Sequence, residues 1–143
     1  MRILGLDVGD KTIGIAISDP LGFTAQGLLN YERTDSQKKD TDKVIELLRE
    51  YDCETVVVGL PLNLNGTDSV QTEKVRAFTE KLMNKMRSNG LGNVNVVLED
   101  ERFTTKIASA AMKEAGVRSD KRKKVIDKQA AVVILQGYLE SRR

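Results

Sequence analysis

An α/β fold, with helices on both faces of a mixed five-stranded sheet, is the fold class that the sequence predicts. Three strand-like segments follow one another with only turns between them, which is typical of an antiparallel meander. The later strand-like segments alternate with helix-like ones, which favours parallel strands covered by helices. The chain has 143 residues, 40% hydrophobic and 31% charged, which suits a single packed domain over residues 1–143.

The strands are predicted from alternating apolar residues and from β-branched runs bounded by turn residues. The first segment is a short apolar run that ends at Asp7, and the turn at Gly9 separates it from the second. Pro20 and Gly22 mark the turn before the third segment. The five predicted strands span residues 2–7, 12–18, 23–30, 55–58 and 94–98.

The helices are predicted from apolar residues that recur at helical spacing among charges. The four segments with this pattern are residues 38–50, 69–87, 105–115 and 125–139. Thr104 is the expected N-cap of the third helix, and Gly116 is expected to end it. The order of elements is therefore β-β-β-α-β-α-β-α-α, and the basic residues before the last helix are expected to form a loop.

The composition narrows the chemistry. The chain has no histidine, which excludes Ser-His-Asp and Cys-His catalysis and most zinc sites. It has one cysteine, Cys53, so no disulfide forms within the chain and a reducing compartment suits it. No apolar run approaches the roughly 20 residues of a membrane helix, and no signal-peptide pattern precedes the first strand. We therefore expect a cytoplasmic protein that does not interact with membranes.

Acidic residues stand at three positions that could converge. Asp7 closes the first strand, and Glu99, Asp100 and Glu101 close the fifth. Asp127 begins the last helix, in line with the apolar face behind it. Ligands of open α/β sheets gather outside the carboxyl ends of the strands, and carboxylates there could hold magnesium against a phosphodiester. Glu99 and Glu101 share one face and Asp100 takes the other, and alternation alone does not choose among them.

Basic residues near these acids are candidates for phosphate contacts. The Gly9 turn could bring backbone N–H groups and Lys11 to an anion, although Gly9 and Asp10 also suffice for a plain β-turn. Four consecutive basic residues could hold a nucleic-acid backbone, although a solvated loop is the plainer interpretation. These four residues are Lys121, Arg122, Lys123 and Lys124.

Four stretches in order resemble the YqgF family, also called RuvX-like Holliday junction resolvases, over essentially the full chain. The stretches are Gly5-Leu6-Asp7-Val8-Gly9 with Thr12-Ile13-Gly14-Ile15-Ala16; Val58-Gly59-Leu60-Pro61-Leu62 with Asn65-Gly66-Thr67; Asp100-Glu101-Arg102-Phe103-Thr104-Thr105; and Asp127-Lys128-Gln129-Ala130-Ala131 with Val132-Val133-Ile134-Leu135. The separations of the four stretches also match, which makes the resemblance specific.

The resemblance implies an RNase H-like nuclease that hydrolyses phosphodiesters with two metal ions, Mg²⁺ or Mn²⁺. It selects Asp7, Glu101 and Asp127 as catalytic residues and metal ligands. Arg102 joins the nucleic-acid contacts, and Asp100 either supports Arg102 or binds metal through water. The implied task is maturation of the 5′ end of pre-16S ribosomal RNA in ribosome biogenesis, by a monomer or homodimer. An older interpretation of the family is cleavage of four-way DNA junctions, so branched DNA is a second candidate substrate.

Two other functions compete with the nuclease. A nucleic-acid-binding module without turnover would keep the fold and the basic residues but lose an acid, and all three acids are present. A nucleotide-dependent phosphotransferase is suggested by the segment from Asp7 to Thr12, which also looks like the first phosphate loop of the actin and sugar-kinase superfamily. Those proteins enclose ATP between two such domains, and this chain has room for one.

Overall fold

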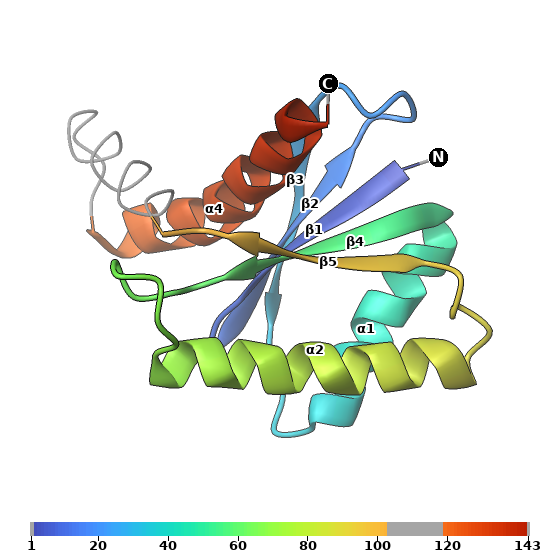
Figure 1. Cartoon of the computed structure of the whole chain (residues 1–143), viewed down its shortest axis with the longest axis horizontal. Helices are drawn as coiled ribbons and strands as arrows, with labels where there is room; N and C mark the ends of the chain where they lie inside the picture. Colours follow the sequence, from blue (N-terminus) through green and yellow to red (C-terminus); the bar gives the residue numbers. More distant parts are fainter. Residues whose placement is uncertain (1, 103–118, 143) are drawn as a thin grey trace.

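A mixed five-stranded sheet forms the centre of the protein, with its strands in the order β3-β2-β1-β4-β5 (Figure 1). The computed structural model describes residues 2–102 and 119–142, and of residues 119–128 it describes the backbone alone. β1, β2 and β3 pair antiparallel, whereas β4 pairs parallel with β1 and β5, which confirms the predicted meander followed by parallel strands. The strands are β1 (Arg2–Val8), β2 (Thr12–Ser18), β3 (Ala25–Glu32), β4 (Cys53–Leu60) and β5 (Asn95–Asp100).

Only β2 has its predicted bounds, and the largest differences, two residues at each end, are those of β3 and β4. β3 begins at Ala25 rather than at residue 23, because the Asp19 carboxylate holds the preceding turn together. It accepts the backbone N–H groups of Phe23 at 2.8 Å and Thr24 at 2.7 Å. β4 continues beyond its β-branched run, since Gly59 and Leu60 still pair with the end of β5. Backbone pairing with neighbouring strands therefore decides these bounds, and side-chain type does not.

Three helices lie in the described part of the chain: α1 (Gln37–Glu50), α2 (Val70–Ser88) and α4 (Ser119–Ser141). Ser36 and Ser69 cap the first two, each accepting a backbone N–H of the first turn with its hydroxyl. The helix predicted over residues 105–115, with its cap at Thr104, lies outside the described residues. None of the described helices combines the length and the apolar character that crossing a membrane requires.

The basic stretch at residues 121–124 is helical, so its prediction as a loop is wrong. α4 begins at Ser119, before the predicted start at residue 125. Lysine and arginine are good helix formers, and neither proline nor glycine occurs between residues 119 and 136. Apolar periodicity locates only the part of a helix that packs on the sheet, so it does not show where α4 begins.

The helices cover both faces of the sheet, as predicted. Figure 1 shows α1 and α2 on one face and α4 on the other. Two apolar cores result. The core between the sheet and α1 with α2 contains Leu6, Val58 and Phe78. The core under α4 contains Ile3 and Val57 together with Ile134 and other residues of that helix.

α4 packs closely on the sheet where small residues meet at the contact. Ala130 and Ala131 are fully buried. A Cβ atom on Gly5 of β1 would lie 2.8 Å from Leu135 Cβ, so a larger residue at this position would push the helix away. Gln136 fixes the helix to β3 by accepting the backbone N–H of Ala25 at 2.9 Å. These contacts hold the part of α4 around Leu135 and Gln136 against β1 and β3.

Candidate active site

Asp7 lies near the carboxyl end of β1, on the face of the sheet that α4 covers. Side chains alternate along the strand. Leu6 and Val8 belong to the core under α1 and α2, whereas Ile3 belongs to the core under α4. Asp7 therefore shares the face of Ile3, and it is half-buried. The strand thus presents an acid at the edge of an apolar core, as the sequence predicts.

Glu101 directly follows β5, and its carboxylate fills the space above Gly59 of β4. Its backbone N–H donates to Leu60 O at 3.2 Å, which extends the pairing of β4 and β5 by one residue. A Cβ atom on Gly59 would lie 2.3 Å from Glu101 Oε2, and this oxygen is buried. The absence of a side chain at position 59 therefore makes the room for the Glu101 carboxylate.

The two carboxylates of Asp7 and Glu101 lie close together. Leu6 is paired with Val58 across the parallel strands β1 and β4, so the same register continued by one residue sets Asp7 beside Gly59. Burial, and then the negative charges of Asp7 and Asp100, raise the pKa of Glu101 to about 8. Two acids that share a buried space repel each other unless a cation or a proton joins them.

The three acids that close β5 differ in their surroundings. Glu99 lies on the same face as Glu101, and burial followed by the charge of Asp100 raises its pKa. Only for Glu101, however, is the charge of Asp7 among the causes of the shift. Asp100 instead accepts the backbone N–H of Arg102 at 3.0 Å and its Nε–H at 2.8 Å. Asp100 therefore supports Arg102, one of the two roles that the sequence allowed it.

Arg102 connects the end of β5 to the loop between β4 and α2. Besides Asp100 it contacts Leu64, whose carbonyl oxygen accepts from Nη1 at 3.2 Å. Gly66 passes close by, since a Cβ atom there would lie 3.3 Å from Nη1. The side chain stays 33% exposed, so part of the guanidinium still faces solvent beside Glu101. Its predicted contact with nucleic acid remains a proposal.

The remaining predicted residues are placed only in part. Lys11 is exposed in the turn between β1 and β2. Asp127 lies in α4, four residues before the buried Ala131, but its side chain lies outside the described residues. The same holds for the side chains of Lys121, Arg122, Lys123 and Lys124. Among the side chains that are described, no three acids, cysteines or histidines form a metal site, so convergence of Asp127 on Asp7 and Glu101 stays a prediction.

Two features of the site were not found from the sequence. The first is the space that Gly59 leaves for the Glu101 carboxylate. The sequence does carry a signal for it, because an isolated glycine inside a strand often marks the close approach of another group. The second is a group of polar residues from the end of β3, the segment after it and α1, centred on the buried Asp40, which contacts the Gly9 turn. Its members are common polar residues without a motif, and only the fold brings them to the turn.

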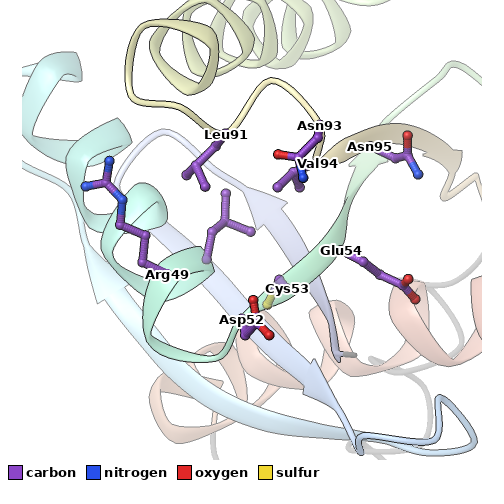
Figure 2. A pocket seen from close by; sticks show the side chains of 9 residues that line it. Arg49, Asp52, Cys53, Glu54, Leu91, Asn93, Val94 and Asn95 are labelled. Carbon is purple, nitrogen blue, oxygen red and sulfur yellow. The ribbon is translucent and has the colours of Figure 1, made fainter.

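A separate hollow opens at the opposite end of the sheet (Figure 2). Cys53, Glu54 and Asn95, at the amino ends of β4 and β5, line it together with Arg49 and Asp52. Cys53 is buried, and burial raises the pKa of its thiol to about 11. The neutral thiol is a poor nucleophile. The thiol of Cys53 is therefore not a candidate nucleophile.

The pH dependence of stability should reveal the buried state of Glu101. Its pKa in the folded protein is about 8, against an ordinary value of 4.5, so between these values the folded state holds a proton that the unfolded chain has lost. The stabilisation that comes from keeping Glu101 protonated is complete below the ordinary pKa of 4.5, and it is lost as the pH rises through the folded pKa of about 8. We therefore expect the unfolding temperature of metal-free protein to fall, relative to that of Glu101→Gln, as the pH is raised through this window.

The unfolding temperature is measured by thermal unfolding in the presence of a chelator, at a series of pH values across this window. Glu54→Gln, which removes an exposed glutamate at the far end of the sheet, serves as the matched control. Its curve should run parallel to that of the wild type. Parallel curves for Glu101→Gln as well would show that Glu101 is ordinarily ionised in the folded protein.

The fold and the acid pair together define the class of protein. Three antiparallel strands followed by two parallel ones, with helices on both faces, form an RNase H-like fold. The solved structure of T. thermophilus RuvC in complex with a Holliday junction substrate has this fold too. It aligns with a TM-score of 0.59 and 16% identity, covering 99% of this chain and 95% of that chain. At that identity the likeness concerns the fold alone.

Residues 1–141 match the model of the RuvX family, which is described as Holliday junction resolvase, and the chain belongs to this family. A relative in Desulforamulus reducens is 51% identical over 141 residues, covering 99% of this chain and 98% of the relative. A relative in Clostridium novyi is 50% identical over 141 residues, with 99% of both chains covered. Both relatives carry the name "Putative pre-16S rRNA nuclease". The resemblance found in the sequence is thereby confirmed.

Proposed function

We propose that this protein is a metal-dependent nuclease that hydrolyses phosphodiester bonds, and that its task is maturation of the 5′ end of pre-16S ribosomal RNA. The observation that carries the proposal is the carboxylate pair of Asp7 and Glu101 at the carboxyl ends of parallel strands. The names of relatives about half identical to this chain support the substrate. An rRNA precursor as substrate would place the protein in the cytoplasm. We further propose that residues 1–143 form one nuclease domain, which acts as a monomer or homodimer.

The residues present fit Mg²⁺ or Mn²⁺. Both ions prefer hard oxygen ligands, and a cation would offset the burial and the negative charges of Asp7 and Asp100 that raise the pKa of Glu101. Asp7 and Glu101 would hold the metal from the sheet, and Asp127 would add a ligand from α4. Bound metal ions activate water and stabilise the leaving oxygen of a phosphodiester.

The chain's own residues supply the frame for this chemistry. β1 places the Asp7 carboxylate, and the space left by the missing side chain of Gly59, called here the Gly59 gap, accommodates that of Glu101 on the same face. Lys11 and Arg102 lie at the same end of the sheet, one after β1 and the other after β5. Positive side chains at such places contact phosphates without reading the base sequence. We infer that they orient the backbone of the nucleic acid beside the acids.

A second candidate function is cleavage of four-way DNA junctions, because the family model carries that description. A comparison of substrates separates the two functions. Purified protein is incubated with labelled pre-16S rRNA, a DNA junction and plain single strands, in Mg²⁺ or Mn²⁺. Cleavage of the RNA precursor is expected, and cleavage of the junction alone would favour the second function. Binding of these substrates without cleavage of any would identify a module that has lost turnover.

The basic stretch at the start of α4 is proposed to hold the phosphate backbone. Replacing Lys121, Arg122, Lys123 and Lys124 by glutamine should weaken binding of all sequences about equally, because lysines act as point charges. Each lost contact should flatten the slope of log affinity against log salt by roughly 0.7 for a single strand and 0.9 for a duplex.

Affinities are measured over a range of salt concentrations, together with turnover at saturating substrate. Since the acids remain, turnover should fall much less than affinity. Glutamine is also a good helix former, so the first turns of α4 are retained in the variant. An unchanged salt slope would show that these residues only keep the helix end solvated.

A further inference from the structure

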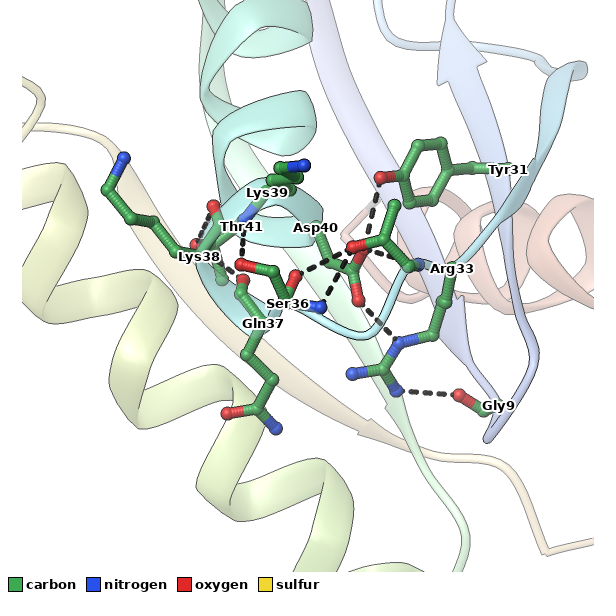
Figure 3. A network of polar contacts seen from close by, with 10 residues as sticks. Gly9, Tyr31, Arg33, Ser36, Gln37, Lys38, Lys39, Asp40 and Thr41 are labelled. Atoms are coloured by element: carbon green, nitrogen blue, oxygen red, sulfur yellow. Dashed lines mark hydrogen bonds and ion pairs between the residues drawn. The ribbon is translucent and has the colours of Figure 1, made fainter.

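The turn between β1 and β2 is held in place by a residue from another part of the chain. Arg33, which follows β3, donates from Nη1 to Gly9 O at 2.8 Å (Figure 3). Its backbone N–H donates to Lys11 O, also at 2.8 Å. Within the turn, the N–H of Gly9 donates to Thr12 O at 2.8 Å. One residue therefore holds two carbonyl groups of the short connection that begins at Gly9, two residues after Asp7.

Asp40 of α1 in turn holds the guanidinium of Arg33. Its Oδ2 accepts from Arg33 Nε at 3.0 Å, and its Oδ1 accepts from the Tyr31 hydroxyl at 3.0 Å (Figure 3). The backbone N–H and the hydroxyl of Thr34 donate to the same Oδ1, each at 3.0 Å. Asp40 is fully buried, yet these hydrogen bonds outweigh the effect of burial and hold the pKa of the carboxyl below its ordinary value.

α2 completes the surroundings of the turn. The Arg33 guanidinium stacks over the Phe78 ring at 5.2 Å from its centroid. Gln71 Nε2 donates to Val8 O at 3.3 Å, and Lys74 forms an ion pair with Asp10 at 3.3 Å. Two helices and the end of β3 therefore converge on the three residues that link β1 to β2.

We propose that Arg33 and Asp40 are positioning residues that set the β1–β2 turn, and through it the direction of Asp7 and the place of Lys11. A buried ion pair is an inefficient way to stabilise a core, because removing both charges from water costs about as much as their attraction returns. This pair directs an arginine at the Gly9 carbonyl, two residues from Asp7 along the same backbone. A shift of the turn must therefore move the end of β1.

This inference rests on the proposed function, since it assigns the two residues to the proposed metal site. Arg33→Lys tests it, because lysine keeps the charge but cannot bond Asp40 and Gly9 with one planar group. Arg49→Lys is the matched control: Arg49 Nη2 likewise donates to a backbone carbonyl, that of Asn89, at 2.7 Å. That contact lies at the other end of α1, away from the turn. Asp40→Asn, which keeps the size of the side chain, is the second variant.

Two quantities are measured on the full chain: the hydrogen-exchange rates of the backbone N–H groups of residues 9–12 without metal, and the affinity for Mn²⁺ alone. We expect Arg33→Lys and Asp40→Asn to speed hydrogen exchange in the turn. They should also weaken Mn²⁺ binding by about tenfold, which is the smaller loss of affinity seen when a residue that supports a metal ligand is replaced. Arg49→Lys should change neither. Thermal unfolding shows that each variant is folded under the conditions used.

The outcomes separate the inference from the proposed function. If the wild type cleaves RNA and binds Mn²⁺, and Arg33→Lys binds Mn²⁺ equally well, the positioning role is overturned and the nuclease stands. If the exchange rates of the turn rise as much in Arg49→Lys as in Arg33→Lys, the role is overturned as well. If the wild type neither binds Mn²⁺ nor cleaves any substrate, the proposed function falls, and the assignment of Arg33 and Asp40 to a metal site falls with it.

Discussion

Replacing Asp7 by asparagine is expected to abolish cleavage while leaving the fold and nucleic-acid binding nearly intact. The substitution keeps the size of the side chain and removes the negative charge that a metal ligand needs. Replacing a residue that only supports a metal ligand lowers metal affinity or activity by about 10–100-fold. Loss of the proposed ligand itself should therefore reduce the cleavage rate by more than about 100-fold. The rate is measured on labelled pre-16S rRNA in Mg²⁺ and again in Mn²⁺.

Asp10→Asn is the control for this substitution. Asp10 is an exposed acid in the adjoining turn, and it forms an ion pair with Lys74. An exposed ion pair of this kind contributes little to the stability of the fold. The control should cleave at nearly the normal rate. In metal-free protein, Asp7→Asn should also raise the unfolding temperature slightly, because it removes the charge that acts on Glu101. Normal cleavage by Asp7→Asn would remove Asp7 from the mechanism.

Replacing Gly59 by alanine should impair both stability and cleavage, for two separable reasons. The new methyl group would lie 2.3 Å from Glu101 Oε2 and 2.5 Å from Ile134 Cδ1, both far inside normal contact distance. Crowding of this kind in a packed core costs about 1–3 kcal/mol. The displaced Glu101 carboxylate would also lose its place beside Asp7, so we expect the cleavage rate to fall by at least about tenfold, as with loss of support for a metal ligand. Denaturant unfolding and the cleavage assay measure the two effects.

A double variant separates these two effects. Gly59→Ala combined with Ile134→Val removes the methyl group that meets the new Cβ atom, while the contact with Glu101 remains. We expect the double variant to regain much of the stability lost on Gly59→Ala and little of the cleavage. Ile134→Val alone is the reference for the small cost of removing one buried methyl group, about 0.5–1.5 kcal/mol. Full recovery of cleavage in the double variant would show that the Gly59 gap serves α4 rather than Glu101.

The sequence by itself determined the order of the described elements and placed Asp7 near the end of the first strand. Alternation along residues 12–18 and helical spacing along residues 38–50 depend on which side chains face the core, and this pattern is local. It therefore predicted β2 at its observed bounds and α1 to within one residue. Asp7 at the carboxyl end of β1 followed from the same pattern. The start of α4 did not, because its basic first turns carry no apolar pattern.

The tertiary structure decided the features that join distant parts of the chain. Alternation did not choose among Glu99, Asp100 and Glu101. The register pairs Glu99 with Gly59, yet it is the Glu101 carboxylate that lies over Gly59 and feels the charge of Asp7. Asp40 and Gly9 are likewise linked through Arg33 only because β3 and α1 meet at the turn. The local pattern of a sequence reports which side chains are buried. Which of them touch is set by strand order and register, and these depend on the packing of the whole fold.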